Sequence, residues 1–574
     1  MSNLGRLAVI ALVAVFAAIT YPGAVLVSMV VRLTPPPGVS SPAPGGAVPW
    51  LHVAHPDAGQ PYIADDAGRL VLLHGAVPAG LLDFWTGADK SQADSPPVYP
   101  IDPAAYNGQC PTPSALSRYP PLCRLDITEM AGLGFNSVRL PVSWSLLEPE
   151  RGHFSQAYID RVAQVVDWAR AAGLYVIIDM HQNAYSRYVS PGSGVNLSYH
   201  SGAPAWATLT DGFPSEVLVK DKREANPAVF EAFSNFWYNR NGIQAEYIAA
   251  IAALAKRFKN DSTVAGYSVF NEPQPGWNLP PGFEDLLLFP FYRRVIDAVT
   301  GARDGWPCPT GIFMPAVCGF RDLGVDDRRH LFFLEPGLLR QMTDFPTHLG
   351  LPVSSYPNLV LDIHAYTHGY TLDALFSTPD PVHATYPWGG YDQTYSLAER
   401  EAKAMNAALF VAEFGNDPKD DSLILTNELL QQEKHVVGFA FWVWKENGDR
   451  GSWGVYDPPT VHATSLVSSG CIRPSRERQL ARVYPRASAD RKLTFHYDSE
   501  TGAFTLQARG QPGDPPTVVY LPRQVTGEVT VFGALSDRSV TTNGDGSRVV
   551  TTTPSGGAFS IAVAPAPLAL TGCQ

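Results

Sequence analysis

The stretch Gly266-Tyr-Ser-Val-Phe-Asn-Glu-Pro273 is an apolar run of strand length that stops at a polar pair followed by proline. Proline has no backbone N–H to donate, so it ends a strand. The stretch therefore predicts a buried strand that places Glu272 just beyond its carboxyl end. A polar strand end that merely enters a loop would look similar, and Asn-Glu-Pro alone does not separate the two interpretations.

A second stretch of the same kind, Ala408-Leu-Phe-Val-Ala-Glu-Phe-Gly415, places Glu413 at the end of another short apolar run. Parallel strands of one barrel end on a common face, and that face carries the chemistry in such folds. Glycoside hydrolysis requires two carboxyl groups there, one as acid/base and one as nucleophile or base. Glu272 and Glu413 are therefore the predicted catalytic pair.

Strands and helices alternate along most of the chain. An apolar helical face over 158–172 is closed by Gly173 and followed at once by the apolar run 174–179, a βαβ pattern. The pattern recurs without a Gly-rich dinucleotide motif after the first strand, which favours an α/β fold of the (β/α)8 TIM barrel type over an open sheet. The other predicted strands are 69–75, 136–141, 267–270, 312–314 or 331–335, 359–364, 408–413 and 437–444, and the other predicted helices are 125–133, 243–258 and 291–299.

Composition divides the 574 residues into four parts. Residues 7–31 carry no charge and reach membrane-spanning length, so 1–33 is predicted to be a signal sequence or an N-terminal membrane anchor. Either one makes the protein secreted or extracytoplasmic. A Pro/Gly/Ser-rich linker follows at 34–47. The catalytic barrel is predicted over 48–482, and the short alternating runs of 483–574 predict a small C-terminal β-sandwich.

The net charge of −12 argues against a nucleic-acid partner, which would require a basic face. Six cysteines in an exported chain predict disulfides, although fifteen pairings are possible and buried free thiols are the alternative. No Cys-x-x-Cys motif occurs, and we expect neither a metal nor a cofactor. The pairings that local spacing favours are Cys110 with Cys123, Cys308 with Cys318, and by elimination Cys471 with Cys573.

Further polar and aromatic side chains are predicted at the ends of other barrel strands, on the face of the two glutamates. Arginine, histidine and tyrosine donors can keep one carboxylate ionised, and an amide can bind a sugar hydroxyl beside the reacting carbon. Aromatic rings offer flat apolar surfaces to sugar C–H groups. The candidate substrate-binding residues are Arg139, Asp179, His181, Asn271, His364, Tyr366, Trp442 and Trp444.

Taken in order, these residues resemble the pattern of glycoside hydrolase family 5. The matching motifs are Arg139-Leu-Pro, Asp179-Met-His-Gln182, Asn271-Glu-Pro273, His364-Ala-Tyr366, Glu413-Phe-Gly415 and the strand of Trp442 and Trp444. Tyr185-Ser186, the long Pro-rich early loop and Arg482-Val-Tyr-Pro-Arg486 resemble the endoglycoceramidases of that family, while Asn183 and Lys445 depart from the expected pattern.

The resemblance implies a retaining mechanism with Glu272 as acid/base and Glu413 as nucleophile. It also implies cleavage of the bond between an oligosaccharide and ceramide in glycosphingolipids. We expect a monomer whose partner is a glycolipid or oligosaccharide substrate, with a membrane surface as a possible second partner. The apolar residues 286–290 could line an acyl-chain groove or form the buried face of a helix.

Other functions remain open. An endo-β-glucanase, or a β-glucosidase acting on another glycoside such as a steryl glucoside, would share the barrel and both glutamates. A non-catalytic carbohydrate-binding protein would be expected to lack one of the glutamates, and both are present. A metal-dependent hydrolase would use Asp179, His181, His364 and His368, but these histidines lack the clustered spacing of barrel metal sites.

Overall fold

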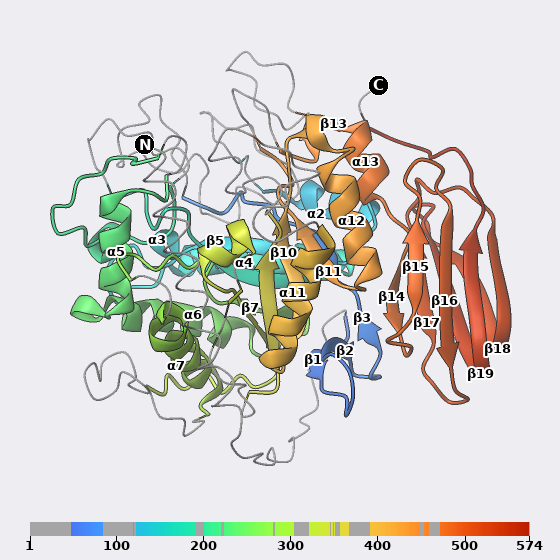
Figure 1. The fold of residues 1–574 in the computed structure, drawn as a ribbon, viewed down its shortest axis with the longest axis horizontal. Coiled ribbons are helices and arrows are strands. Elements are labelled where there is room, and N and C mark those ends of the chain that lie inside the picture. Colours follow the sequence, from blue (N-terminus) through green and yellow to red (C-terminus); the bar gives the residue numbers. More distant parts are fainter. Residues whose placement is uncertain are drawn as a thin grey trace, which may run out of the picture.

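The computed structural model describes residues 48–83, 119, 122–189, 200–219, 223–278, 282–302, 321–344, 346–347, 349, 356–366, 391–446, 453–457 and 471–572. They form a parallel barrel and, beside it, a larger antiparallel sheet (Figure 1). The predicted signal or anchor segment and the linker lie outside these residues. Among the described helices, none combines the length and apolar character needed to span a bilayer.

The barrel closes through parallel pairing of strands in chain order, with the last strand, β11, beside the first, β4. All residues of β5, β6 and β9 are buried, because helices cover the outside of the barrel and side chains fill its inside. The predicted (β/α)8 fold is confirmed. The barrel strands are β4 (His74–Ala76), β5 (Ser137–Ser143), β6 (Tyr175–His181), β7 (Val264–Ser268), β8 (Leu331–Leu334), β9 (Leu359–His364), β10 (Ala408–Phe414) and β11 (Gly438–Phe441).

The longer helices fall where the apolar periodicity predicts them. In α4 the Ser155 side chain accepts a hydrogen bond from the N–H of Tyr158, and Gly173, at φ 70°, ends the helix. The described helices are α2 (Arg124–Gly132), α3 (Trp144–Leu147), α4 (Gln156–Ala172), η2 (Ala205–Ala207), α5 (Pro227–Trp237), η3 (Arg240–Gly242), α6 (Ile243–Phe258), η4 (Glu284–Leu288), α7 (Phe289–Thr300), α8 (Leu338–Thr343), α11 (Tyr391–Ala404), η6 (Pro418–Asp420), α12 (Ile424–Lys434) and α13 (Pro474–Leu480).

Residues 286–290 belong to η4 and the start of α7. Leu287, Leu288 and Pro290 are buried, and the two leucines belong to the barrel's main hydrophobic core. Leu286 alone among the leucines of this run is largely exposed. The packing therefore favours the buried face of a helix over an acyl-chain groove.

The prediction of one strand over 69–75 is wrong, because the chain changes sheet within it. Residues 70–71 form β3 (Leu70–Val71) of the antiparallel sheet, and the barrel strand β4 begins at His74. The Asn136 side chain separates the two strands: its Nδ2 donates to the carbonyl of Leu72 at 2.8 Å, and its Oδ1 accepts from the N–H of His74 at 2.8 Å. Hydrogen bonds between a side-chain amide and the backbone of a segment distant in sequence produce no local sequence pattern, so the break could not be predicted.

The C-terminal region is antiparallel, as predicted, and its strands form one continuous sheet with a core of its own. β19 pairs with β17 along its first part and with β16 along its last part, while β18 pairs with β19 along most of its length. The strands of this sheet are β1 (Leu51–Ala54), β2 (Tyr62–Asp65), β3, β14 (Tyr484–Ser488), β15 (Thr494–Tyr497), β16 (Phe504–Gly510), β17 (Thr517–Leu521), β18 (Val529–Thr542) and β19 (Arg548–Val563).

Strands β1 to β3 join the same sheet through the pairing of β3 with β14 (Figure 1). The region predicted as barrel from residue 48 therefore begins with three strands that belong to the C-terminal sheet. The barrel is tied to this sheet from both ends of its own sequence. A short separate ribbon, β12 (Tyr456–Asp457) with β13 (Cys471–Ile472), lies between the last barrel strand and α13 in the sequence.

Of the six cysteines, two fall within the described residues. Cys123 and Cys471 are both disulfide-bonded. The other four, Cys110, Cys308, Cys318 and Cys573, lie outside the described residues, so the three pairings remain predictions.

Candidate active site

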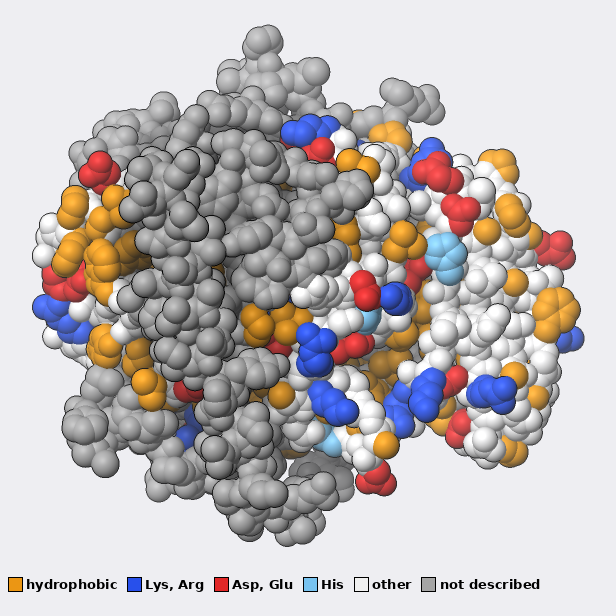
Figure 2. Space-filling view, viewed as in Figure 1, with side chains coloured by type: hydrophobic (Ala, Val, Ile, Leu, Met, Phe, Trp, Pro, Cys, Tyr) orange, Lys and Arg blue, Asp and Glu red, His pale blue; other side chains and the backbone are white. Residues whose placement is uncertain are grey.

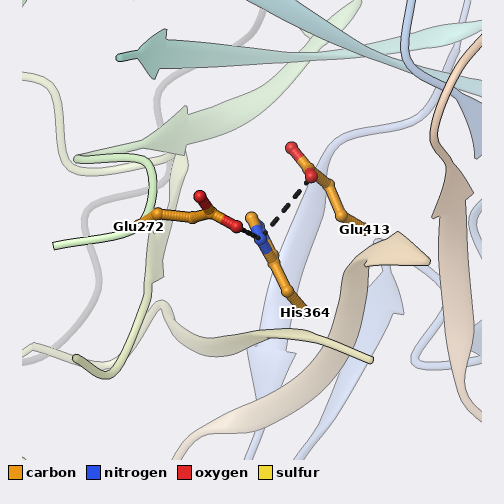
Figure 3. Close-up of side chains that lie close together, drawn as sticks. All are labelled: Glu272, His364 and Glu413. Carbon is orange, nitrogen blue, oxygen red and sulfur yellow. Dashed lines mark hydrogen bonds and ion pairs between the residues drawn. The ribbon is translucent and has the colours of Figure 1, made fainter. Parts of the chain in front are cut away.

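The two glutamates meet at the carboxyl ends of the barrel strands. Glu413 lies near the end of β10, and Glu272 follows β7 in a loop. Glu272 has φ 45°, a left-handed conformation that is unusual for a residue other than glycine. Carboxylate oxygens of Glu272 and Glu413 and a ring nitrogen of His364 lie within 4.8 Å of one another (Figure 3). The side chain of Glu272 is 16% exposed and that of Glu413 5%, so Glu272 is the more accessible carboxyl group.

Two donors hold the Glu413 carboxylate. Arg139 donates from Nη1 to Oε1 in a buried ion pair, and the Tyr366 hydroxyl donates to Oε2 at 3.0 Å. Burial raises the pKa of Glu413, against the opposing positive charges of His364 and Arg139. Hydrogen bonds to both oxygens stabilise the ionised form that a nucleophile requires.

Arg139 lies at the centre of the site. Burial would lower its pKa, but the charges of Asp179 and Glu413 outweigh burial and raise the pKa, so the guanidinium stays charged. Its Nη2 donates to Asn271 Oδ1 at 2.9 Å and lies 3.1 Å from Asp179 Oδ1. The Asn271 amide also donates to the carbonyl of Gln182 at 3.0 Å. The orientation of Asn271, beside the acid/base candidate, is therefore set by contacts on both sides of its amide.

His364 lies between the two glutamates, as Figure 3 shows. Its Nδ1 is 3.1 Å from Glu272 Oε1 and 3.6 Å from Glu413 Oε2. Burial would raise the pKa of Glu272, but the hydrogen bond and the charge of His364 outweigh burial and lower it. His364 thus lies within ion-pair distance of both carboxylates and affects the protonation of each.

The site wall next to Asn271 is formed by an aromatic pair. His181 Nδ1 is 2.7 Å from Asp179 Oδ2, and the Trp442 ring stacks on the His181 ring with centroids 5.4 Å apart and planes at 6°. Glycine follows Glu413 at position 415 because a Cβ there would come within 2.0 Å of the Trp442 carbonyl oxygen. This close approach fixes Trp442 relative to the end of β10.

Trp444 does not join these side chains. It is buried, donates from Nε1 to Asp126 Oδ1 at 2.9 Å and packs against Tyr456. Lys445, which departs from the expected pattern, pairs with the same Asp126 oxygen and therefore compensates a buried carboxylate of α2. Trp444 is accordingly removed from the candidate sugar-binding residues, and Trp442 is kept.

Asn183, the other departure, accepts a hydrogen bond from Arg223 Nη2 at 2.9 Å. Arg223 contributes to the electrostatic environment of Glu272, because its charge is among those that lower the pKa of that carboxyl. Arg223 lies between η2 and α5, so this part of the chain contributes positive charge to the surroundings of the acid/base candidate.

Two buried carboxyl groups of the site were not among the predicted residues. Glu335 directly follows β8, and Asp362 lies within β9. A signal for Glu335 existed, since Leu331-Phe-Phe-Leu-Glu335 is a third apolar run ending in glutamate. Asp362 interrupts the apolar run of its strand. Burial and the charge of Glu335 raise its pKa, and it accepts a hydrogen bond from Ser268 Oγ at 3.1 Å.

Two groups of side chains have the composition of a metal site: Glu272, His364 and Glu413, and Glu335, Asp362 and His364. The three glutamates of these groups are already paired with a positive group of the protein, whereas Asp362 accepts a hydrogen bond from the Ser268 hydroxyl. Arg139 binds Glu413 and Glu335, and His364 is shared by the two groups. His368, part of the metal-dependent alternative, lies outside the described residues. The geometry is that of a carboxylate site balanced by arginine and histidine.

Residues 124–448, which span β5 to β11 and the face with both glutamates, match the family model "Cellulase (glycosyl hydrolase family 5)". The chain belongs to glycosyl hydrolase family 5. This family 5 glycoside hydrolase is 24% identical to endoglycoceramidase I of Rhodococcus hoagii over 474 residues, which cover 80% of this chain and 78% of that protein.

Solved structures share this fold over most of the chain. The crystal structure of an endogalactoceramidase is similar with a TM-score of 0.65 and 26% identity, over 90% of this chain and all of that one. The Cryptococcus neoformans sterylglucosidase 1 has a TM-score of 0.59 at 14% identity, over 94% of this chain and all of that one, and shares the fold. The chain is thus an endoglycoceramidase-like member of family 5.

Proposed function

We propose that this family 5 hydrolase cleaves the β-glycosidic bond between an oligosaccharide and ceramide with retention of configuration. The observation that carries the mechanism is the short separation of the catalytic carboxylates, whose oxygens lie within 4.8 Å of one another. Retaining glycosidases place their carboxyl groups about 5–5.5 Å apart, whereas inverting enzymes need about 6.5–9.5 Å to admit a water molecule. The spacing supports direct attack by a protein carboxylate.

In the proposed reaction Glu413 attacks the anomeric carbon and forms a covalent glycosyl-enzyme, while Glu272 protonates the departing oxygen. Water then attacks the same carbon, with Glu272 as general base, and frees Glu413. Arg139 and Tyr366 hold the nucleophile in place, and Asn271 lies where a sugar hydroxyl next to the reacting carbon would bind. The aromatic face of Trp442 would pack against the sugar.

The lipid part of the proposal rests on the relatives and on exposed apolar side chains in the segments that follow Glu272 and η2. Trp277, which follows Glu272 by five residues, is 47% exposed and contacts the exposed ring of Phe213 at a centroid distance of 5.5 Å. Leu218, in the loop that also carries Arg223, is 58% exposed. Figure 2 shows hydrophobic side chains grouped at the left of this face, where Figure 1 places α5. Exposed apolar groups in these segments would suit a lipid aglycone.

An extracytoplasmic location forms part of the same proposal. Its support is the uncharged segment 7–31, which lies outside the described residues. Glycosphingolipid substrate would then meet the enzyme at a membrane surface.

The decisive experiment identifies the products. The protein is incubated in separate reactions with a ganglioside in detergent, a cello-oligosaccharide and a steryl glucoside, and products are identified by mass. Intact oligosaccharide plus ceramide is the expected result. Cleavage between sugars alone, or release of sterol alone, would replace the ceramide assignment while leaving the two glutamates in their roles.

Replacing Leu218 with aspartate is expected to lower the rate on ganglioside in lipid vesicles about tenfold, because roughly 1.5 kcal/mol of apolar contact with lipid is lost. Hydrolysis of a water-soluble aryl glycoside should not change. Phe532→Asp is the matched control, since Phe532 is 62% exposed on β18 of the other sheet. An equal loss on both substrates, or an equal loss in the control, would contradict a lipid-contacting role for Leu218.

A further inference from the structure

Glu335 is a buried carboxylate that touches three parts of the site at once. Its Oε1 accepts a hydrogen bond from Arg139 Nη2 at 2.9 Å and lies 3.2 Å from His364 Nε2. Its Oε2 accepts from the backbone N–H of Glu272 at 2.7 Å. The carboxylate therefore fixes the strained backbone of Glu272, as well as the ring of His364.

The position of His364 between carboxylates determines which protonation state fits. Nδ1 faces Glu272 Oε1 at 3.1 Å and Nε2 faces Glu335 Oε1 at 3.2 Å. A neutral imidazole carries one N–H and would turn its other nitrogen's lone pair toward a carboxylate oxygen. The imidazolium form carries an N–H on both nitrogens and places its positive charge within ion-pair distance of both carboxylates.

We propose that His364 stores the proton that Glu272 delivers to the leaving oxygen, and that Glu335 is the positioning residue that keeps both His364 nitrogens protonated. The proposal rests on the assignment of Glu272 as acid/base. As the glycosidic bond breaks, the His364 Nδ1 proton passes to Glu272 Oε1, and the Glu272 carboxyl donates one proton to the departing oxygen. In the second step Glu272 takes a proton from water, and one proton returns to Nδ1, so the site ends as it began.

The charges around His364 support this arrangement. Burial alone would lower the pKa of His364, but the charges of Glu335 and Glu413 and the hydrogen bond to Glu272 outweigh burial and raise it well above its usual value. The hydrogen bond and charge of His364 lower the pKa of Glu272, a shift that favours the proton on the histidine in the resting site. The charged and titratable groups that surround His364 are Glu272, Glu335, Glu413, Asp362, Asp179, Arg139, His181 and Tyr366.

The first test needs no substrate and no altered carboxylate. In the full chain labelled with 15N-histidine, the His364 signals are assigned by comparison with His364→Gln, and their ring-nitrogen shifts are followed from pH 6 to 8. Two protonated nitrogens over this range are expected. A neutral His364 would overturn the proposal, whatever the natural glycolipid turns out to be.

The second test uses the leaving group. In Glu335→Gln we expect kcat/KM to fall about 100-fold on octyl β-lactoside, whose alkoxide leaving group needs protonation, and no more than about 3-fold on 2,4-dinitrophenyl β-lactoside, which needs none. The His364 signals should shift to those of a neutral ring. Glu335→Asp, which retains the charge, should recover most of the activity on the octyl substrate.

Tyr292→Phe is the matched control. The Tyr292 hydroxyl donates to the backbone carbonyl of Glu335 at 2.7 Å, so its loss disturbs the same segment without changing the charge. This variant should change kcat/KM by the same factor on both substrates. An equal loss on both substrates in Glu335→Gln, with His364 still doubly protonated, would show a structural role and overturn the proposal. If Glu335→Gln does not fold, the spectrum of the unmodified protein decides.

Discussion

Replacing Glu413 with glutamine is expected to abolish turnover, with kcat falling by at least about 10⁴-fold, because an amide cannot form the glycosyl-enzyme. The loss should be similar for lipid-linked and aryl glycosides, since both require the nucleophile. Arg139 keeps its contacts with Glu335 and Asp179, so the variant should fold. Initial rates on a ganglioside and an aryl glycoside, together with a thermal unfolding curve, check these expectations.

The matched control for this substitution is Glu428→Gln. Glu428 is also a buried glutamate, but it lies on α12 and accepts a hydrogen bond from Tyr395 at 2.6 Å, outside the candidate site. It should retain activity. A Glu413→Gln enzyme with more than a few per cent of the parent activity would remove Glu413 from the nucleophile role.

Replacing Glu272 with alanine is expected to lower kcat/KM on the ganglioside about 10³-fold, because an alkoxide then leaves without a proton. On an aryl glycoside with a good leaving group the first step should remain fast. The second step then becomes slow for lack of a base, so a burst of phenol is expected before a slow steady rate. Stopped-flow measurement of phenol release would show this burst.

Azide separates the roles of the two glutamates. In Glu272→Ala, azide needs no general base and attacks the glycosyl-enzyme, so a β-glycosyl azide should form. In Glu413→Ala, azide would replace the missing carboxylate and attack the substrate from the opposite face, so an α-glycosyl azide should form. The reverse assignment of products would exchange the roles of the two residues, and inversion by the unmodified enzyme would exclude a retaining mechanism.

Local sequence patterns were sufficient to predict the barrel and to place Glu272 and Glu413 on one face of it. Most barrel strands are short apolar runs, so consecutive residues are enough to predict their type, whereas β4, His74–Ala76, is not such a run. Parallel strands of a barrel end on one face, which made the common location of Glu272 and Glu413 predictable. Arg139, Asn271 and Tyr366 were predicted on the same face for the same reason, because they lie at or near the ends of barrel strands. In the structure they contact one another or Glu413.

The errors arose where contacts between distant segments decide the outcome. Asn136 ends β3 and separates it from β4 by binding the backbone on both sides, and β3 then pairs with β14. Trp442 and Trp444 stand two residues apart in one aromatic run, and only packing shows that one meets His181 and the other Asp126. No periodicity distinguishes the two.

The sequence by itself determined the fold class, the family pattern and the two glutamates, because these depend on strand and helix periodicity and on residues adjacent to strand ends. Only the tertiary structure decided the charge arrangement around them. His364 is held between Glu272 and Glu335, and Arg139 between Glu413 and Glu335, although the paired residues are 29 to 274 residues apart in sequence. The protonation of these groups depends on the distances between their charges. Those distances are set only when the barrel closes and brings the strand ends together.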